Sequence, residues 1–362
     1  MKTLRVLYPL ARADFFARAR RYSFLLILAA IIYLGVLVNN DTLFISLTPS
    51  DLTNRSLPSF RGEFNSAWIG TMTVVGSNVF LSLFGFYLVN DCVQRDVRTG
   101  VGQIIATTPI SRAAYLVGKW LSNYLVLFML ELILAASALI MVLIKRQAAV
   151  EPVALLMPFL VAGMPLMALV AALAVVMESV PWLRGVIGNV AYFILWILIV
   201  FAVVFLPLIG LEFPILDDPL GNSLFTTSLK TAAQAAYPGE SIGWLGVGHY
   251  DVTFKEFYWP GLAWNLGVVA RQWVWALIGL GLVLLSATWF GRFDPAREGL
   301  PRLPFSLKSA WNGQPGGTER PAFHLPLPDL SPLVTRWASY NPFLGVLVAE
   351  LRLLLKGRRW WW

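Results

Sequence analysis

Six long runs of apolar residues divide this chain of 362 residues. An α-helix of about 20 apolar residues crosses the hydrocarbon core of a bilayer. Hydrophobic residues make up 57% of the chain and charged residues only 13%, which lies outside the range of soluble domains. We therefore predict an all-α integral membrane protein whose transmembrane domain, residues 22–290, contains about six transmembrane helices. The predicted spans are residues 22–38, 67–90, 115–144, 153–177, 186–211 and 266–290.

The distribution of lysine and arginine predicts how these spans are oriented. Basic residues gather before the first span, between the second and third, between the fourth and fifth, and after the sixth. Cytoplasmic segments carry such an excess. The outer loop of residues 212–262 is acidic and aromatic, whereas Lys145 and Arg146 are an exception whose side chains can reach lipid headgroups. We expect a multi-pass protein of the bacterial plasma membrane with cytoplasmic N- and C-termini.

The two ends of the chain are basic and amphipathic. Residues 1–21 predict an interfacial helix that lies along the membrane before the first span. A cleavable signal peptide is the alternative, but no small-residue cleavage site follows the first apolar run. Residues 291–342 are rich in proline and predict a cytoplasmic linker, and residues 343–362 predict a second basic helix that ends in three tryptophans.

The second basic helix repeats the first. Ala11 and Ala349 are each followed, at the same spacing, by two arginines and an aromatic residue. In the first copy this pattern leads directly into a span. Residues 343–362 are therefore either the possible start of a second half of a longer membrane protein or an amphipathic anchor, and both interpretations stay open.

The segment of residues 91–112 between the second and third spans has the most informative pattern. It predicts a charged turn, a short amphipathic helix and a stop at Pro109. The apolar face of this helix would contain Val97, Val101, Ile104 and Ile105. An ordinary cytoplasmic loop, which is the alternative, needs no such face. We interpret the segment as a contact element for another protein.

Composition excludes several classes of function. A single cysteine, Cys92, forms no intrachain disulfide, and two histidines separated by a span predict neither a metal site nor a histidine-based triad. The net charge is +8, and the basic residues cluster beside the apolar spans. Contact with anionic lipid headgroups therefore explains this charge better than binding of nucleic acid. No phosphate-binding glycine loop is present, and the glutamates form no pair at a recognisable spacing. We predict that the chain is not an enzyme; a membrane-embedded enzyme and a non-transporting scaffold or sensor are the alternatives.

Glu131 lies in the middle of the third span, between Leu130 and Leu132. An ionised carboxylate there costs at least a few kcal/mol, so it should face the bundle, a partner or water. One interpretation is a proton or cation site on a translocation path. The other, which we favour, is a protonated or hydrogen-bonded structural contact, for example to Asn78 or Asn189.

The fourth span and the loop after it have two further features. Pro158 and Pro165 interrupt the span and predict a kink. Glu178 and Arg184 bracket the short loop to the fifth span, which is either a second contact with a partner or a plain turn. We favour the plain turn.

The order of these elements and three motifs resemble the membrane-spanning permease subunits of type 2 ABC exporters. The elements are a basic interfacial helix, a span, an outer loop, a second span and then the segment 91–112. The motifs are Arg95-Asp96-Val97-Arg98-Thr99-Gly100, Thr107-Thr108-Pro109-Ile110-Ser111-Arg112 and Leu116-Val117-Gly118-Lys119. The resemblance covers most of the chain up to residue 290.

The resemblance implies that segment 91–112 is a coupling helix that docks on a separate ABC ATPase subunit. It also implies a second permease protomer or half, with ATP and Mg²⁺ bound by the ATPase and no cofactor bound by this chain. Membrane lipid is the remaining expected partner, and the exported substrate stays open. The residues expected to contact the ATPase are Gln94, Arg95, Asp96, Val97, Arg98, Val101, Ile104 and Ile105, with Arg95, Asp96 and Arg98 fixing the register by charge pairing.

Overall fold

A computed structural model of the protein describes residues 22–38, 44–49, 58–145, 149–205, 218–240, 242–248, 254–291 and 293, which belong to one compact unit. The predictions for residues 1–21 and 343–362, and for nearly all of the linker 291–342, lie outside the described residues. The described chain is mostly helical. Within it, five helical segments are long and apolar enough to cross a membrane, as expected of a multi-pass membrane protein.

The helices follow the predicted apolar runs. The first, α2, has 17 residues and is too short to count among the five, so the described chain has five long helical segments and one shorter apolar helix where about six spans were predicted. Helix α6 is the longest, with 34 residues. The bounds are α2 Tyr22–Val38, α3 Ser66–Val89, α6 Arg112–Lys145, α7 Pro152–Pro158, α8 Met164–Ser179, α9 Val186–Phe205 and α11 Leu266–Ser286.

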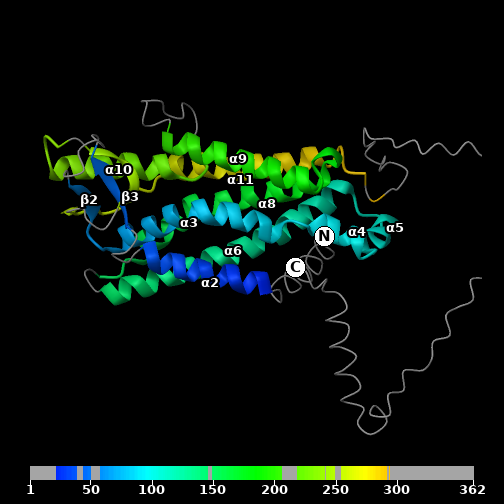
Figure 1. Ribbon diagram of the computed structural model, residues 1–362, viewed down its shortest axis with the longest axis horizontal. Helices are drawn as coiled ribbons and strands as arrows, with labels where there is room; N and C mark the ends of the chain where they lie inside the picture. The colour runs from blue at the N-terminus through cyan, green and yellow to red at the C-terminus, as the bar shows by residue number, and fades with distance from the viewer. Residues whose placement is uncertain are drawn as a thin grey trace, which may run out of the picture. The chain divides into compact units, whose positions relative to one another are not determined.

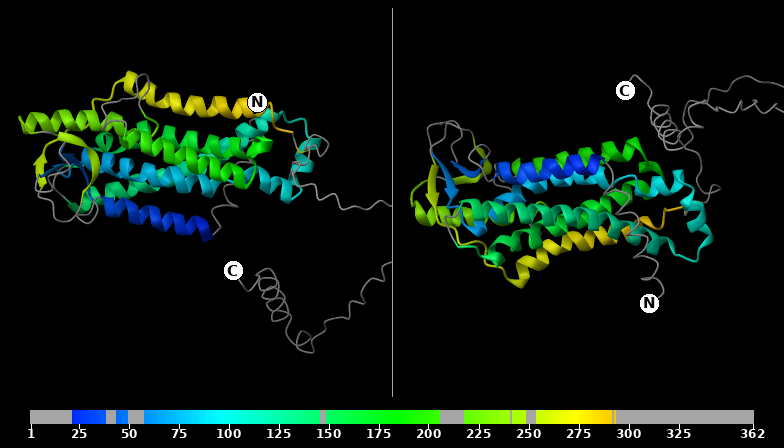
Figure 2. Two further views of the ribbon diagram at one scale, coloured as in Figure 1. Left: turned by 45° about the horizontal axis from the view of Figure 1, so that its top comes forward. Right: turned by 90° about the horizontal axis from the view of Figure 1, so that it is seen from below.

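Helix α8 lies at the centre of the bundle and packs against α6, α3 and α11 (Figure 1). Small side chains allow the close approach of α11, because a Cβ added at Gly279 would lie 3.1 Å from the Cβ of Ala172. Helices α2 and α11 lie on opposite sides of this arrangement (Figure 2). Any displacement of α8 therefore reaches several spans through direct packing.

The interruption predicted in the fourth span is present between its two prolines, Pro158 and Pro165. Helix α7 ends at Pro158 and continues into the π-helical turn η1, Phe159–Gly163, before α8 begins. Proline lacks a backbone N–H and removes one helical hydrogen bond, which a wider turn accommodates. Pro165 lies in the first turn of α8, which continues directly from η1, so the wider turn lies on the N-terminal side of Pro165, where the missing N–H leaves a carbonyl without its helical donor.

A small sheet joins the two loops that were predicted to lie outside the membrane, for which the sequence indicated no strands. The strands are β1 Phe44–Pro49, β2 Ser59–Gly62, β3 Ile242–Gly248 and β4 Phe254–Phe257, in the order β3-β1-β2-β4. Strand β1 pairs antiparallel with β2 and β3, and β2 pairs parallel with β4. The sheet and helix α10, Asn222–Ala236, form the end of the bundle shown on the left of Figure 1. The all-α prediction therefore holds for the spans but not for the outer loops.

The turn before α10 is buried between the spans. Asp218 accepts hydrogen bonds from the backbone N–H groups of Asn222 and Ser223, at 3.1 and 2.6 Å. The side-chain amides of Gln272 and Asn78 donate to the carbonyl oxygens of Asp218 and Leu220. Burial raises the pKa of the Asp218 carboxyl, and the hydrogen bonds from α10 oppose that rise. This part of the predicted outer loop is thus fixed to α3 and α11.

A substitution at Gly221 tests how tightly this turn is packed against η1. Its φ is +76°, and a Cβ there would lie 2.7 Å from the Cβ of Ala162 in η1. We expect Gly221→Ala to lower the free energy of unfolding by about 2–4 kcal/mol, from backbone strain and overpacking together. Gly239→Ala is the matched control, because Gly239 also has a positive φ but no atom within 4 Å of an added Cβ. Equal melting temperatures for the two variants in detergent would contradict the packing described.

Candidate functional site

Segment 91–112 projects from the end of the bundle opposite the sheet (Figure 1). It forms two seven-residue helices, α4 Cys92–Arg98 and α5 Val101–Thr107, rather than the single predicted helix. Gly100, with φ +75°, ends α4, because its N–H bonds to the carbonyl of Val97 in a left-handed cap. The predicted stop at Pro109 is confirmed, since α5 ends at Thr107.

One anchor holds α4 to α6. Asp96 is buried, pairs with Lys119 Nζ at 2.8 Å and accepts a hydrogen bond from the hydroxyl of Tyr115 at 2.7 Å. The Lys119 side chain is itself fully buried. Asp96 was predicted to pair with a partner protein, whereas in the structure its buried carboxylate pairs with Lys119 of this chain.

A second anchor holds α4 to α8. Glu178, in the last turn of α8, accepts hydrogen bonds from three backbone N–H groups in the first turn of α4. The donors are Cys92 at 2.9 Å, Val93 at 2.6 Å and Gln94 at 3.1 Å. Asp91, at the N-cap position, makes no side-chain cap, so a carboxylate from another helix satisfies these donors. The loop that Glu178 and Arg184 bracket contains a short turn, η2 Pro181–Leu183, in line with the favoured prediction, and Glu178 in addition clamps α4 to α8.

The outer face of the two helices is apolar and exposed. Val97, Val101 and Ile104 are 49%, 38% and 67% exposed. We call these three residues the α4–α5 patch. Ile105, predicted on the same face, is buried in a small apolar cluster with Cys92 and Phe290, because the break at Gly100 changes the direction of α5. The patch is thus narrower than predicted, and it lies on a segment fixed from two sides.

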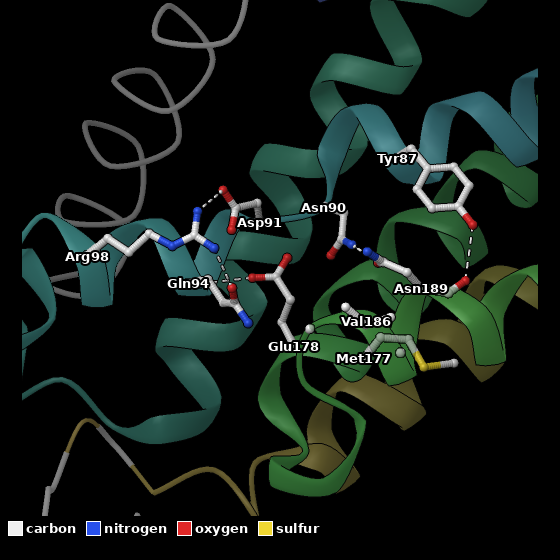
Figure 3. Close-up of a pocket in the computed structure, with 11 residues that line it drawn as sticks. Tyr87, Asn90, Asp91, Gln94, Arg98, Met177, Glu178, Val186 and Asn189 are labelled. Carbon is white, nitrogen blue, oxygen red and sulfur yellow. Dashed lines mark hydrogen bonds and ion pairs between the residues drawn. The ribbon is translucent and has the colours of Figure 1, made fainter. Parts of the chain in front are cut away.

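A cavity of about 410 Å³ lies beside α4 (Figure 3). Arg98 reaches into it from α4, donates to Gln94 Oε1 at 2.8 Å and pairs with Asp91 at 3.3 Å. On the other side, Asn90 donates to Asn189 Oδ1 at 2.5 Å. We call it the α4–α9 cavity. Its lining residues are Tyr87, Asn90, Asp91, Gln94, Arg98, Met177, Glu178, Gly185, Val186, Gly188 and Asn189.

Arg95 and Gln94, the remaining predicted contact residues, lie on α4 and are half-buried. The Gln94 side chain accepts a hydrogen bond from Arg98 and lines the α4–α9 cavity; it is not part of the exposed patch. Arg184, which the sequence paired with Glu178 at the ends of one loop, donates through Nε to the backbone carbonyl of Glu178 at 3.0 Å. The loop between α8 and α9 is thus hydrogen-bonded to the same residue, Glu178, that holds α4.

Glu131 lies inside the helix bundle, at 1% exposure. Among the described residues, neither of its carboxylate oxygens has a hydrogen-bond partner. It faces η1, because a Cβ added at Gly163 would lie 2.8 Å from Oε2. Asn78 donates to Leu220 and Asn189 accepts from Asn90, so the suggested contacts of Glu131 with these two residues are not formed.

Comparisons with known proteins do not assign this chain to a family. No protein-family model matches it, and no curated protein matches it. Within the described residues, no group of three or more side chains is placed to hold a metal ion. The geometry at this end of the bundle, with its doubly anchored helix pair, apolar patch and cavity, is therefore the basis for inferring function.

Proposed function

We propose that the chain is the transmembrane permease subunit of an ATP-driven exporter of the type 2 ABC class. In this proposal the α4–α5 patch docks on a separate ATPase subunit that binds ATP and Mg²⁺. The observation that supports the proposal is that the exposed apolar side chains lie on a helix pair that two sets of buried contacts fix to α6 and α8. A loop that only connected two spans would need neither a buried ion pair nor a capping carboxylate from a third helix.

The anchors determine where a displacement of the patch would go. Helix α4 follows α3 directly, is clamped to α8 by Glu178 and is paired with α6 through Asp96 and Lys119. Movement of α4 would therefore act on three spans, including the central α8, and not only on the second and third. Alternating access requires that ATP binding stabilise one arrangement of these spans over another. Six spans with cytoplasmic ends, a second protomer or half and a plasma-membrane location belong to the same proposal.

Replacing apolar side chains of the α4–α5 patch with serine should weaken docking on the ATPase without affecting folding. We expect Val101→Ser with Ile104→Ser to leave the melting temperature unchanged, since exposed side chains contribute little to stability. The affinity for the ATPase should fall about tenfold to a hundredfold, the change typical of losing apolar interface anchors. Co-purification with the ATPase and its ATP turnover are the measurements.

Val153→Ser is the matched control, because Val153 is 66% exposed, almost the same as Ile104, but lies at the start of α7. It should leave co-purification unchanged. Normal association of the patch variant with the ATPase would overturn the assignment of this surface.

Cysteine labelling tests the side of the membrane on which the patch lies. Cys92, the only native cysteine, is buried and should remain unreactive in the folded protein. We expect Tyr258→Cys to react with a membrane-impermeant maleimide in intact cells, and Ile104→Cys to react only after permeabilisation. Tyr258 is 62% exposed and follows β4, so the two positions are similarly accessible. Labelling of Ile104→Cys from outside would exclude contact with a cytoplasmic ATPase.

A further inference from the structure

The α4–α9 cavity lies where α3 changes from apolar to polar and where α9 begins. Along α3, Phe80 and Phe84 are exposed apolar side chains, and the helix ends at Val89, followed by Asn90 at the C-cap and the half-buried, charged Asp91. Along α9, the polar end of the cavity at Asn189 adjoins a series of exposed apolar side chains. These are Val186, Val190, Ile194, Ile197 and Leu198. This transition is typical of the boundary between the hydrocarbon core and the headgroup region.

The wall of the cavity is itself amphipathic. Val186, which is 77% exposed, lines the cavity together with the polar Asn189 and Arg98. Tyr87 lies at the same level and donates to the backbone carbonyl of Asn189 at 3.0 Å. Tyrosine with one apolar and one hydrogen-bonded end is characteristic of the membrane interface. The lining of the cavity thus combines the apolar Met177 and Val186 with the charged Asp91, Arg98 and Glu178.

The two accessible charges of the cavity have opposite signs. The Arg98 and Asp91 side chains are 66% and 37% exposed, and they pair with each other at 3.3 Å. Glu178 also lines the cavity, but its oxygens accept the three N–H groups of α4. A smaller cavity of about 140 Å³ continues along α4 past Arg98 and Glu178 to Arg184. The accessible pair therefore offers one cationic and one anionic group side by side.

We propose that the α4–α9 cavity binds the headgroup of a phospholipid that carries both a phosphate and a primary ammonium group, as in phosphatidylethanolamine. The phosphate binds Arg98, and the ammonium binds Asp91. The acyl chains lie along the exposed apolar faces of α3 and α9. An anionic headgroup without an amine leaves Asp91 facing a like charge, and a quaternary ammonium donates no hydrogen bond to it. The site requires only that these helices span a membrane, and it does not depend on an ATPase.

The test measures lipid retention by the full-length chain. The protein is purified from detergent containing equal amounts of phosphatidylethanolamine, phosphatidylglycerol and phosphatidylcholine, and the bound lipid is identified by native mass spectrometry. We expect phosphatidylethanolamine to be enriched. Arg98→Gln and Asp91→Asn should each lower that enrichment about tenfold, as expected from losing one charge-assisted hydrogen bond. Asparagine tolerates the positive φ of +74° at position 91, so the fold should be kept.

Arg112→Gln is the control, because Arg112 begins α6 at the same end of the bundle but is not among the cavity-lining residues. It should retain the wild-type lipid preference. Equal retention of the three lipids, a preference for phosphatidylglycerol, or unchanged enrichment in the Arg98 and Asp91 variants that melt like the wild type would each overturn the proposal. Because retention is measured without an ATPase, failure here leaves the proposed exporter function untouched.

Discussion

Replacement of Glu178 with alanine is expected to lower the free energy of unfolding by about 3–5 kcal/mol and to release the start of α4 from α8. The variant leaves the N–H groups of Cys92, Val93 and Gln94 without their acceptor, in a place where Cys92 and Val93 are almost fully buried. Each buried donor without a partner costs about 1–3 kcal/mol. Unfolding in detergent measures the loss, and hydrogen exchange of these three amides locates it.

Two further variants make this test specific. Glu178→Gln keeps one acceptor oxygen and should lose about half as much stability as the alanine variant. Glu151→Ala removes an exposed carboxylate at the N-cap of α7 that makes no side-chain cap, so it should change stability by less than about 0.5 kcal/mol. If the α4 amides of Glu178→Ala exchange as slowly as those of the wild type, the clamp has no role in holding the helix.

Breaking the Asp96–Lys119 pair is the second change with a large expected effect. Asp96→Asn leaves the fully buried Lys119 without its counter-charge, and Lys119→Met leaves Asp96 in the same position. Removing one partner of a buried pair costs about 3–5 kcal/mol. The double variant Asp96→Asn with Lys119→Met removes both charges, keeps an acceptor for Tyr115 and should be more stable than either single variant.

A double-mutant cycle on the free energy of unfolding measures this coupling. We expect a coupling energy of about 2 kcal/mol or more between the two positions. Additive losses from the two single variants would mean that the two charges do not stabilise each other in the folded protein. In the same double variant only Glu178 still anchors α4, so its free energy of unfolding shows how much stability that anchor provides without the ion pair.

The sequence predicted the spans better than the contacts between them. Apolar runs identify membrane helices from local composition alone, and the long helices α3, α6, α9 and α11 begin or end near the predicted residues. Segment 91–112 was also recognised as helical. The break at Gly100 was missed because glycine within a short helical pattern does not by itself reveal a positive φ.

The two anchors depend on residues that are distant in sequence. Glu178 lies 84 to 86 residues from its three donors, so no local pattern links it to α4. Lys119 did carry a signal, because a lysine inside a predicted span is expensive unless it has a partner. The sheet was missed for the same reason as the clamp: β1 pairs with β3 about 200 residues later in the chain, and its strands are short.

Photocrosslinking in intact cells is the most direct test of the proposal that the α4–α5 patch docks on an ATPase subunit. A photoreactive amino acid replaces Ile104 in the patch, and a second variant carries it at Tyr258 near the outer sheet as the control. The proposal predicts that the Ile104 variant forms an adduct with a chain that carries a nucleotide-binding loop, and that the Tyr258 variant does not. An Ile104 adduct made only with lipid, or none with such a chain, would contradict it.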